Sequence, residues 1–167
     1  MPHDEILDIV DQDDNVIGRR SRCEIYQEGL SCFRVVNVFL INSTCQLWIP
    51  RRTVSKRIFP LCLDMSMGGH VESGESYEIA LERELSEELN LSLYEHEATY
   101  LGYLTPHKDR VSAFMKVFEF KIEQTPFYNR DDFCEYYWLT PQEALSMIEK
   151  GEPSKDDLPK LIKRFYT

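Results

Sequence analysis

The sequence predicts an α/β fold in a single domain, with strands before and after a central helix and two helices at the end of the chain. The most apolar run, at residues 33–41, should be a buried strand. Residues 76–89 carry apolar side chains at helical spacing, and runs typical of strands lie on both sides of them. The 167 residues fit one domain, residues 1–167, that can bury a full core.

The first half of the chain is expected to consist mainly of strands joined by short turns. Alternating, β-branched residues indicate the first strand, and the polar turn after it predicts a hairpin. The expected elements are this hairpin at residues 5–10 and 16–18, one or two helical turns at 21–27, strands at 33–41 and 46–50, and a run at 61–67 that leads into a turn at Gly68 and Gly69.

The second half begins with the predicted central helix, whose apolar stripe should face the core. This stripe consists of Tyr77, Leu81, Leu85 and Leu89. Strands are then expected at residues 99–104, 112–122 and 135–139, followed by a helix from Pro141 to Lys150 that stops at Gly151. Ser154 and Asp157 resemble a capping box for a last helix, with Leu158, Leu161, Ile162 and Phe165 on its apolar face.

The composition argues against several classes of protein. A net charge of −10 disfavours nonspecific binding to a nucleic acid polymer or an anionic membrane. No window approaches the roughly 20 apolar residues of a membrane span, and no signal peptide is recognisable. The five cysteines are odd in number and contain no Cys-x-x-Cys pair, so we expect reduced thiols in a cytoplasmic protein.

Three glutamates on the central helix predict a metal site. Glu84, Glu87 and Glu88 fall within an arc of roughly 100° on a helix of 3.6 residues per turn. Like charges at this spacing repel one another, and a bound cation would relieve the repulsion. Carboxylate oxygens suit Mg²⁺ or Mn²⁺ better than zinc or copper. The alternative is a solvated helix face, but an ordinary surface helix more often alternates Glu with Lys.

Basic and aromatic side chains offer contacts for an anionic or planar ligand. Arg51, Arg52 and Lys56 are local cations for a phosphate, or else the solvated end of a strand. His70 follows Gly69 and is either a ligand-binding or a hydrogen-bonded structural histidine. The aromatic residues suit stacking on a base, although core packing is the more common role; they are Tyr137, Trp138, Phe127 and Tyr128.

The glutamate helix and the segment before it resemble the Nudix box. The matching residues are Gly69, Glu75, Arg83, Glu84, Leu85, Glu87, Glu88 and Leu91. Asn90 stands where the family has glycine, and we interpret the departure as tolerated because Asn adopts the left-handed conformation most readily after glycine. The resemblance covers most of the chain and implies a Nudix-type α/β/α sandwich with a central mixed sheet.

The resemblance also implies an activity and roles for the box residues. It implies a Mg²⁺-dependent pyrophosphohydrolase, with Mn²⁺ as a substitute, that cleaves the diphosphate linkage of a nucleoside diphosphate derivative or similar small molecule by water attack at phosphorus. Glu84, Glu87 and Glu88 would bind the metal with the carbonyl of Gly69, and Glu87 or Glu88 would lie nearest the attacking water. Arg83 and Glu75 would form an ion pair that orients this catalytic group.

The resemblance leaves two alternatives to hydrolysis. The flanking sequence is similar to the Nudix branch related to isopentenyl-diphosphate isomerase, which moves a double bond by proton transfer. Its functional cysteine, catalytic glutamate, glutamate ligand and histidine ligand align with Gly68, Ala113, Val111 and Phe33. Isomerase chemistry is therefore the weakest option. A catalytically silent Nudix-like domain that binds a nucleotide or a partner is the main alternative.

Several properties stay open at this level. Substrate choice should depend on loops at residues 107–110 and 124–132, which carry no motif that we can interpret. The sequence does not decide the number of metal ions or whether the chain forms a homodimer. It also leaves open a general base outside the box; the candidates are Glu119, Asp131, Asp132 and Glu135.

Overall fold

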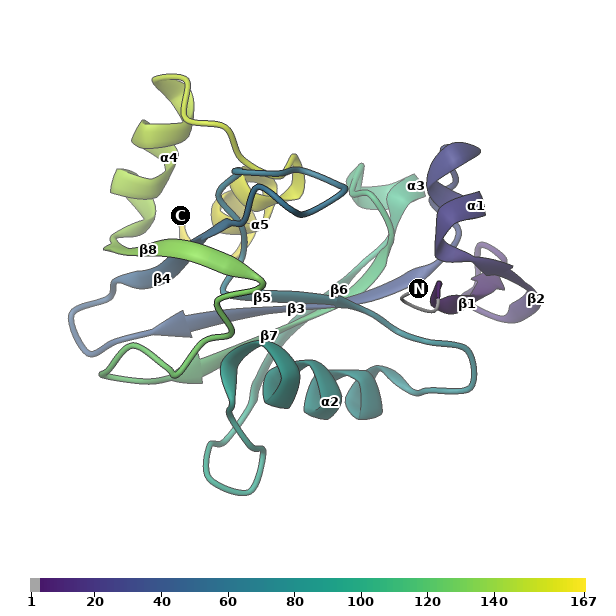
Figure 1. The fold of residues 1–167 in the computed structure, drawn as a ribbon, viewed down its shortest axis with the longest axis horizontal. Coiled ribbons are helices and arrows are strands. Elements are labelled where there is room, and N and C mark those ends of the chain that lie inside the picture. Colours follow the sequence, from purple (N-terminus) through teal and green to yellow (C-terminus); the bar gives the residue numbers. More distant parts are fainter. Residues whose placement is uncertain (1–3) are drawn as a thin grey trace.

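The computed structural model describes residues 4–167 and contains a mixed β-sheet with helices on both faces (Figure 1). The elements are β1 (Ile6–Val10), β2 (Val16–Ser21), α1 (Arg22–Gln27), β3 (Arg34–Ile41), β4 (Leu47–Arg52), β5 (Met67–His70), α2 (Tyr77–Leu89), β6 (Thr99–Leu104), α3 (Pro106–Asp109), β7 (Phe114–Lys121), β8 (Phe133–Leu139), α4 (Pro141–Glu149) and α5 (Asp157–Tyr166).

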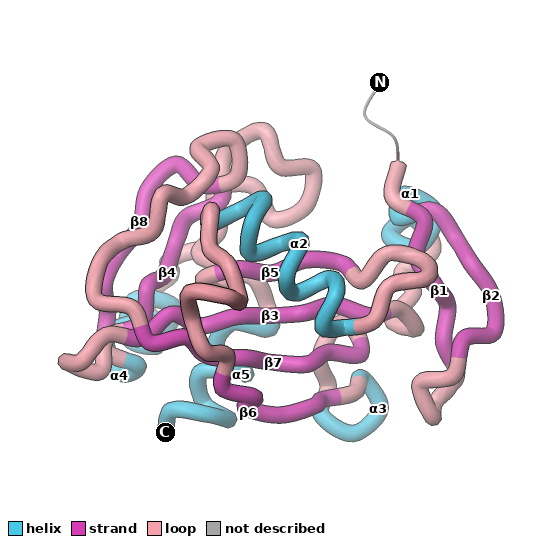
Figure 2. Tube along the Cα trace, turned by 90° about the horizontal axis from the view of Figure 1, so that it is seen from below, coloured by secondary structure: helices cyan, strands magenta, loops and turns pink. Residues whose placement is uncertain are grey.

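The central sheet has the strand order β6-β7-β3-β4-β8, and β5 also pairs with β3. β3 and β7 run parallel over their full length, while the other neighbouring strands are antiparallel. β1 and β2 form a separate antiparallel hairpin. Helix α2 lies across β5 and β3 on one face, and α4 and α5 lie on the other (Figures 1 and 2). The predicted α/β/α sandwich with a mixed sheet is confirmed.

Strand β3 separates the two main hydrophobic clusters. Its side chains alternate between the faces, as the two-residue period of a strand requires. Val36, Val38 and Leu40 pack with the apolar stripe of α2. Phe39 packs on the opposite face with residues of α5, such as Leu161. Both faces of this strand are buried, which explains its nearly continuous apolar sequence.

Side chains and backbone conformation define the ends of α2. The Ser76 hydroxyl accepts a hydrogen bond from the backbone N–H of Ile79 and so caps the first turn. Asn90 ends the helix in the left-handed conformation, with φ of 51°, as predicted for an Asn that replaces the glycine of the family. The helix therefore presents its glutamates in a defined register.

Two local predictions were wrong, and one short helix was missed. Gly68 and Gly69 form part of β5 rather than a turn, because they pair with Asn37 and Val36 of β3. The capping box at the last helix is absent: α5 has no side-chain cap, and the carboxylate of Asp157 accepts a hydrogen bond from the backbone of Ser112 instead.

The short helix α3 was not predicted either. No helix within residues 4–167 is long and apolar enough to cross a membrane.

Candidate functional site

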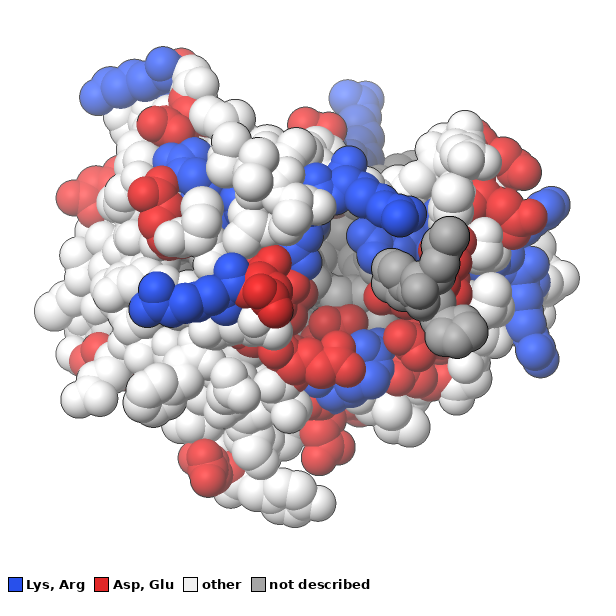
Figure 3. Space-filling model, viewed as in Figure 1, with Lys and Arg blue, Asp and Glu red and all other residues white. Residues whose placement is uncertain are grey.

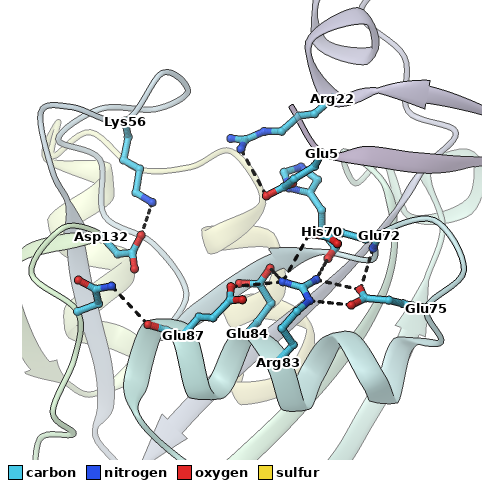
Figure 4. Close-up of polar contacts among 11 residues, drawn as sticks. Glu5, Arg22, Lys56, His70, Glu72, Glu75, Arg83, Glu84, Glu87 and Asp132 are labelled. Atoms are coloured by element: carbon cyan, nitrogen blue, oxygen red, sulfur yellow. Dashed lines mark hydrogen bonds and ion pairs between the residues drawn. The ribbon is translucent and has the colours of Figure 1, made fainter. Parts of the chain in front are cut away.

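The three predicted ligand residues, Glu84, Glu87 and Glu88, lie on α2 in different environments, and Figure 4 shows the first two. Glu84 is buried, whereas 59% of the Glu87 side chain is exposed. Glu88 is partly buried, and its Oε2 is shielded from water without a hydrogen-bond partner among the described residues. A buried carboxylate oxygen without a partner is costly, so this atom is free to accept a cation or a proton.

The carboxylates on this helix are electrostatically strained. Burial raises the pKa of Glu84, and the negative charge of Glu87 adds to the increase. Burial also raises the pKa of Glu88, where the charge of Glu84 is the next cause. Such shifts are common at functional sites, because positioned charges there are held away from water. A divalent cation would favour the ionised forms of Glu84 and Glu88.

Gly69 allows the carboxylate of Glu84 to lie directly against β5. A Cβ atom at position 69 would come within 2.2 Å of Cδ and 2.5 Å of Oε1 of Glu84, far inside van der Waals contact. Because any larger residue would displace the carboxylate, glycine at this position is a structural requirement. Whether its carbonyl binds a cation stays a prediction.

Arg83 links the carboxylates to the segment before the helix (Figure 4). Its guanidinium donates to both oxygens of Glu75, at 2.7 and 2.9 Å, and to the carbonyl of His70 at 3.0 Å. Nη1 also donates to Glu84 at 2.9 Å and to Glu87 at 3.4 Å. The structure therefore brings Arg83 and Glu75 together, as the resemblance implied, and their role in orienting the cluster stays a prediction.

A divalent cation needs oxygen ligands that are not already engaged by other groups of the protein. Within residues 4–167, no three Asp, Glu, His or Cys side chains already lie close enough together to enclose a metal ion. Arg83 contacts Glu84 and Glu87 in this arrangement, so a cation would compete with its guanidinium. The unpartnered Oε2 of Glu88 and the exposed, rotatable side chain of Glu87 supply hard oxygen donors, which suit Mg²⁺ or Mn²⁺.

A cavity of about 800 Å³ lies beside these carboxylates. Acidic and basic side chains face one another across a hollow on this side of the molecule (Figure 3). The carboxylates of α2 form its acidic wall. The cations that line the cavity are Arg22, Arg52, Lys56 and Lys155. If the acidic wall held metal ions, an anionic ligand could bind these ions on one side and meet the basic side chains of the opposite wall on the other.

The predicted basic cluster is divided by the structure. Arg52 and Lys56 line the cavity. The buried Arg52 side chain pairs with Asp64 at 2.9 Å, and Lys56 pairs with Asp132. Arg51 is not among the cavity-lining residues, because the next side chain along a strand points to the other face.

The Arg51 guanidinium instead pairs with Glu135 and Glu152 on that other face. The cavity wall also includes Lys155 and Asn37, and Asp64 supports it through its contacts with Arg52 and Lys155. Nothing in the local sequence of these three residues indicated such a position. They come from segments far apart in the chain.

His70 forms a hydrogen bond with one side chain and lies close to another, in agreement with the structural alternative. Its Nε2 lies 2.8 Å from the Tyr26 hydroxyl, and its Nδ1 lies 3.2 Å from Glu5 Oε2. Burial lowers the pKa of His70, so the neutral imidazole is favoured.

The aromatic candidates lie outside the cavity lining. Tyr128 and Trp138 pack against the cluster under α2, and Tyr137 packs against the cluster on the opposite face. Phe127 is 90% exposed. These positions do not offer a stacking platform beside the carboxylates.

The four acidic candidates for a general base also differ in position. Glu119 accepts a hydrogen bond from Tyr166, and Glu135 pairs with Arg51, so both carboxylates are engaged elsewhere. Asp131 is exposed and does not line the cavity, whereas Asp132 does.

Comparison with known proteins gives a consistent result. The family model described as NUDIX domain matches residues 33–162. An uncharacterized Nudix hydrolase of Nostoc sp. is 61% identical over 162 residues, which cover 97% of this chain and 96% of the relative. A Nudix hydrolase of Deinococcus radiodurans is 44% identical over 165 residues, covering 98% and 95%.

A solved structure and a more distant relative also resemble this chain over most of its length. A crystal structure from Deinococcus radiodurans has a TM-score of 0.93 at 43% identity and covers 98% of this chain and 100% of that chain. An isopentenyl-diphosphate isomerase of Photorhabdus laumondii is 28% identical over 150 residues, covering 89% of this chain and 84% of the relative.

Proposed function

Because this chain belongs to the Nudix family and is a Nudix-type pyrophosphohydrolase, we propose that it hydrolyses the diphosphate linkage of a nucleoside diphosphate derivative, or a similar small molecule, with Mg²⁺ as its cofactor. The observation that carries the proposal is the unpartnered, buried Oε2 of Glu88 beside a cavity with acidic and basic walls. A domain that only packed against itself would gain stability by replacing such a carboxylate with an apolar side chain.

In this proposal, Glu84, Glu87 and Glu88 would hold the cation, and the carbonyl of Gly69 would contribute a further oxygen. When bound, Mg²⁺ supplies positive charge that neutralises the diphosphate and acidifies water. Arg83 keeps Glu84 and Glu75 in fixed positions through its hydrogen bonds. The chain therefore positions the acidic side chains before substrate binds.

The reaction itself needs a proton acceptor and an anchored phosphate. Water attacks one phosphorus atom, a new P–O bond forms, and the bond from that phosphorus to the bridging oxygen breaks. Glu87 or Glu88 accepts the proton of the water. Lys56 and Arg52 contribute positive charge from the opposite wall, which favours binding of the phosphates. The products are two phosphate-terminated molecules.

Substitution of the glutamates tests this proposal directly. The purified protein with Mg²⁺ should release monophosphate products from some member of a panel of diphosphate compounds. Glu87→Gln and Glu88→Gln should each reduce the rate by at least about 10²-fold, the loss typical when a group that stabilises the transition state is removed. Glu82→Gln, on the exposed side of the same helix, is the matched control. Full activity in both variants would reject the assigned site.

The residues around the cavity favour hydrolysis over isomerisation. Phe33 and Ala113, which align with functional positions of the isomerase, lie in a buried apolar cluster with Leu7 and Ile25. Gly68 has no side chain to donate or accept a proton. The acid and base that move a double bond therefore have no counterpart at these positions, whereas the three box glutamates are all present.

A further inference from the structure

Lys155 is a cavity-lining cation with a fixed backbone position. It lies just before α5, and 24% of its side chain is exposed. Its backbone N–H donates to the carbonyl of Leu63 at 2.9 Å, and the N–H of Leu63 donates to the carbonyl of Pro153 at 2.8 Å. These bonds attach the segment before α5 to the strand-like segment that follows β4. The direction in which Lys155 enters the cavity is therefore set by the fold.

The charge around Lys155 is not balanced by its neighbours. Nζ lies 3.6 Å from Oδ1 of Asp64, a carboxylate that is 1% exposed. Oδ2 of the same carboxylate accepts a hydrogen bond from Nη1 of Arg52 at 2.9 Å. Asp64 is the only carboxylate within 4 Å of Lys155 among residues 4–167. One negative charge thus serves two cations, which leaves one positive charge on this wall.

The other cations of the cavity each have a carboxylate of their own. Lys56 pairs with Asp132, and Arg22 lies 3.9 Å from Glu5. Figure 4 shows both pairs on either side of the open space above α2. The uncompensated positive charge is therefore located at Lys155 and Arg52. Of these two, Arg52 is buried and donates to Asp64 and to the carbonyl of Ile58, so Lys155 is the cation with free donors.

Two adjacent glycines connect Lys155 with the carboxylates of α2. A Cβ atom at position 68 would lie 3.7 Å from Nζ of Lys155 and 2.9 Å from Oδ1 of Asn37. A Cβ atom at position 69 would overlap the side chain of Glu84. Since β5 carries no side chain at either position, Lys155 and Glu84 can approach it from opposite faces and line one continuous cavity.

We propose that Lys155 binds a phosphate oxygen of the substrate and holds the diphosphate against the carboxylate wall. This inference rests on the proposed function, because it takes the ligand to be a diphosphate. The physical reason is that an ammonium group with free donors, on a segment whose backbone is attached beside a cation site, forms a charge-assisted hydrogen bond to an anion.

Binding of a nonhydrolysable diphosphate tests the proposal without relying on turnover. Methylenediphosphonate is titrated into the protein with Mg²⁺ by calorimetry. Lys155→Met should weaken binding by about 10- to 100-fold, the range for a hydrogen bond to a charged group. Lys155→Arg should stay close to wild type, because it retains the charge. Lys163→Met, on an exposed position of α5, removes the same charge outside the cavity and should leave binding unchanged.

Thermal unfolding separates a binding role from a structural one. Arg52 still neutralises Asp64 when Lys155 is replaced, so Lys155→Met should keep its melting temperature near the wild-type value. A lowered melting temperature with unchanged affinity would overturn the proposal, as would a wild-type protein that does not bind the probe. The hydrolysis assay is independent: weaker binding in Lys155→Met with no turnover of any diphosphate by the wild type would support Lys155 and reject the proposed function.

Discussion

Replacing Glu84 by glutamine should stabilise the metal-free protein at alkaline pH and have little effect at acid pH. Burial raises the pKa of Glu84 to about 7 from the ordinary 4.5, although the cation of Arg83 opposes the increase. Only 9% of the side chain is exposed, so solvent screens the effect weakly. Glutamine has nearly the same shape and retains an oxygen that can accept the hydrogen bond from Arg83.

The direction of the effect follows from proton binding. Between the unfolded pKa of 4.5 and the folded pKa of about 7, the folded protein keeps a proton that the unfolded chain has released. The free energy of unfolding therefore falls as the pH rises through this window. At about 1.4 kcal/mol for each pKa unit, the wild type loses about 3 kcal/mol by pH 8, and the variant does not.

Urea unfolding in the presence of EDTA measures this difference. Glu84→Gln should be about 3 kcal/mol more stable than wild type at pH 8, and the two should differ by less than about 1 kcal/mol at pH 5. Glu82→Gln is the control, because Glu82 is exposed on the same helix and is not among the groups that shift the pKa of Glu84. Added Mg²⁺ should restore the wild type at pH 8. A difference between variant and wild type that is the same at both pH values would refute the reasoning.

Three further outcomes can be measured on the same protein. Gly69→Ala should displace Glu84, lower kcat at least about tenfold and cost about 1–3 kcal/mol of stability. Gly18→Ala, with open space around it, should change neither kcat nor stability. Equal effects of the two substitutions would contradict the close contact between Gly69 and Glu84. Burial lowers the pKa of His70, so the free energy of unfolding of the wild type should decrease as the pH falls below 6.5, and this decrease should be smaller in His70→Asn. The same pH dependence in urea titrations of both proteins would exclude His70 as the cause of the decrease. Asn90→Gly should be neutral or stabilising and Asn90→Ala destabilising by about 1 kcal/mol in thermal melts, since φ is positive there.

The central helix and its chemistry could be predicted from the sequence because their signals are local. Helical spacing places Glu84, Glu87 and Glu88 on one side, and Ser76 and Asn90 define the ends of the helix through contacts with near neighbours. Strand β3 was equally clear, because a strand buried on both faces is apolar at almost every position. These features depend on residues only a few positions apart.

The features that sequence reasoning missed depend on distant contacts. Two adjacent glycines have no strand propensity of their own, and Gly68 and Gly69 become a strand only because β3 supplies the hydrogen bonds. Asp157 matched a capping pattern, but Ser112 competes for its carboxylate. Lys155 reaches the cavity through bonds to Leu63, which lies 92 positions earlier in the chain, so no local pattern could indicate it.

The parallel pairing of β3 with β7 has a consequence for the order in which the chain folds. Arg34 pairs with Phe114 and Ile41 with Lys121, so the middle of the sheet joins segments about 80 residues apart. Closing so large a loop is slow compared with forming a helix or hairpin. During synthesis on the ribosome, the glutamate helix will therefore leave the exit tunnel well before the sheet that supports it is complete. β3 and β5, which lie against that helix, precede it in the chain, but Phe118 and Phe120 of β7 complete the cluster beneath it, so part of this apolar surface stays exposed until β7 emerges.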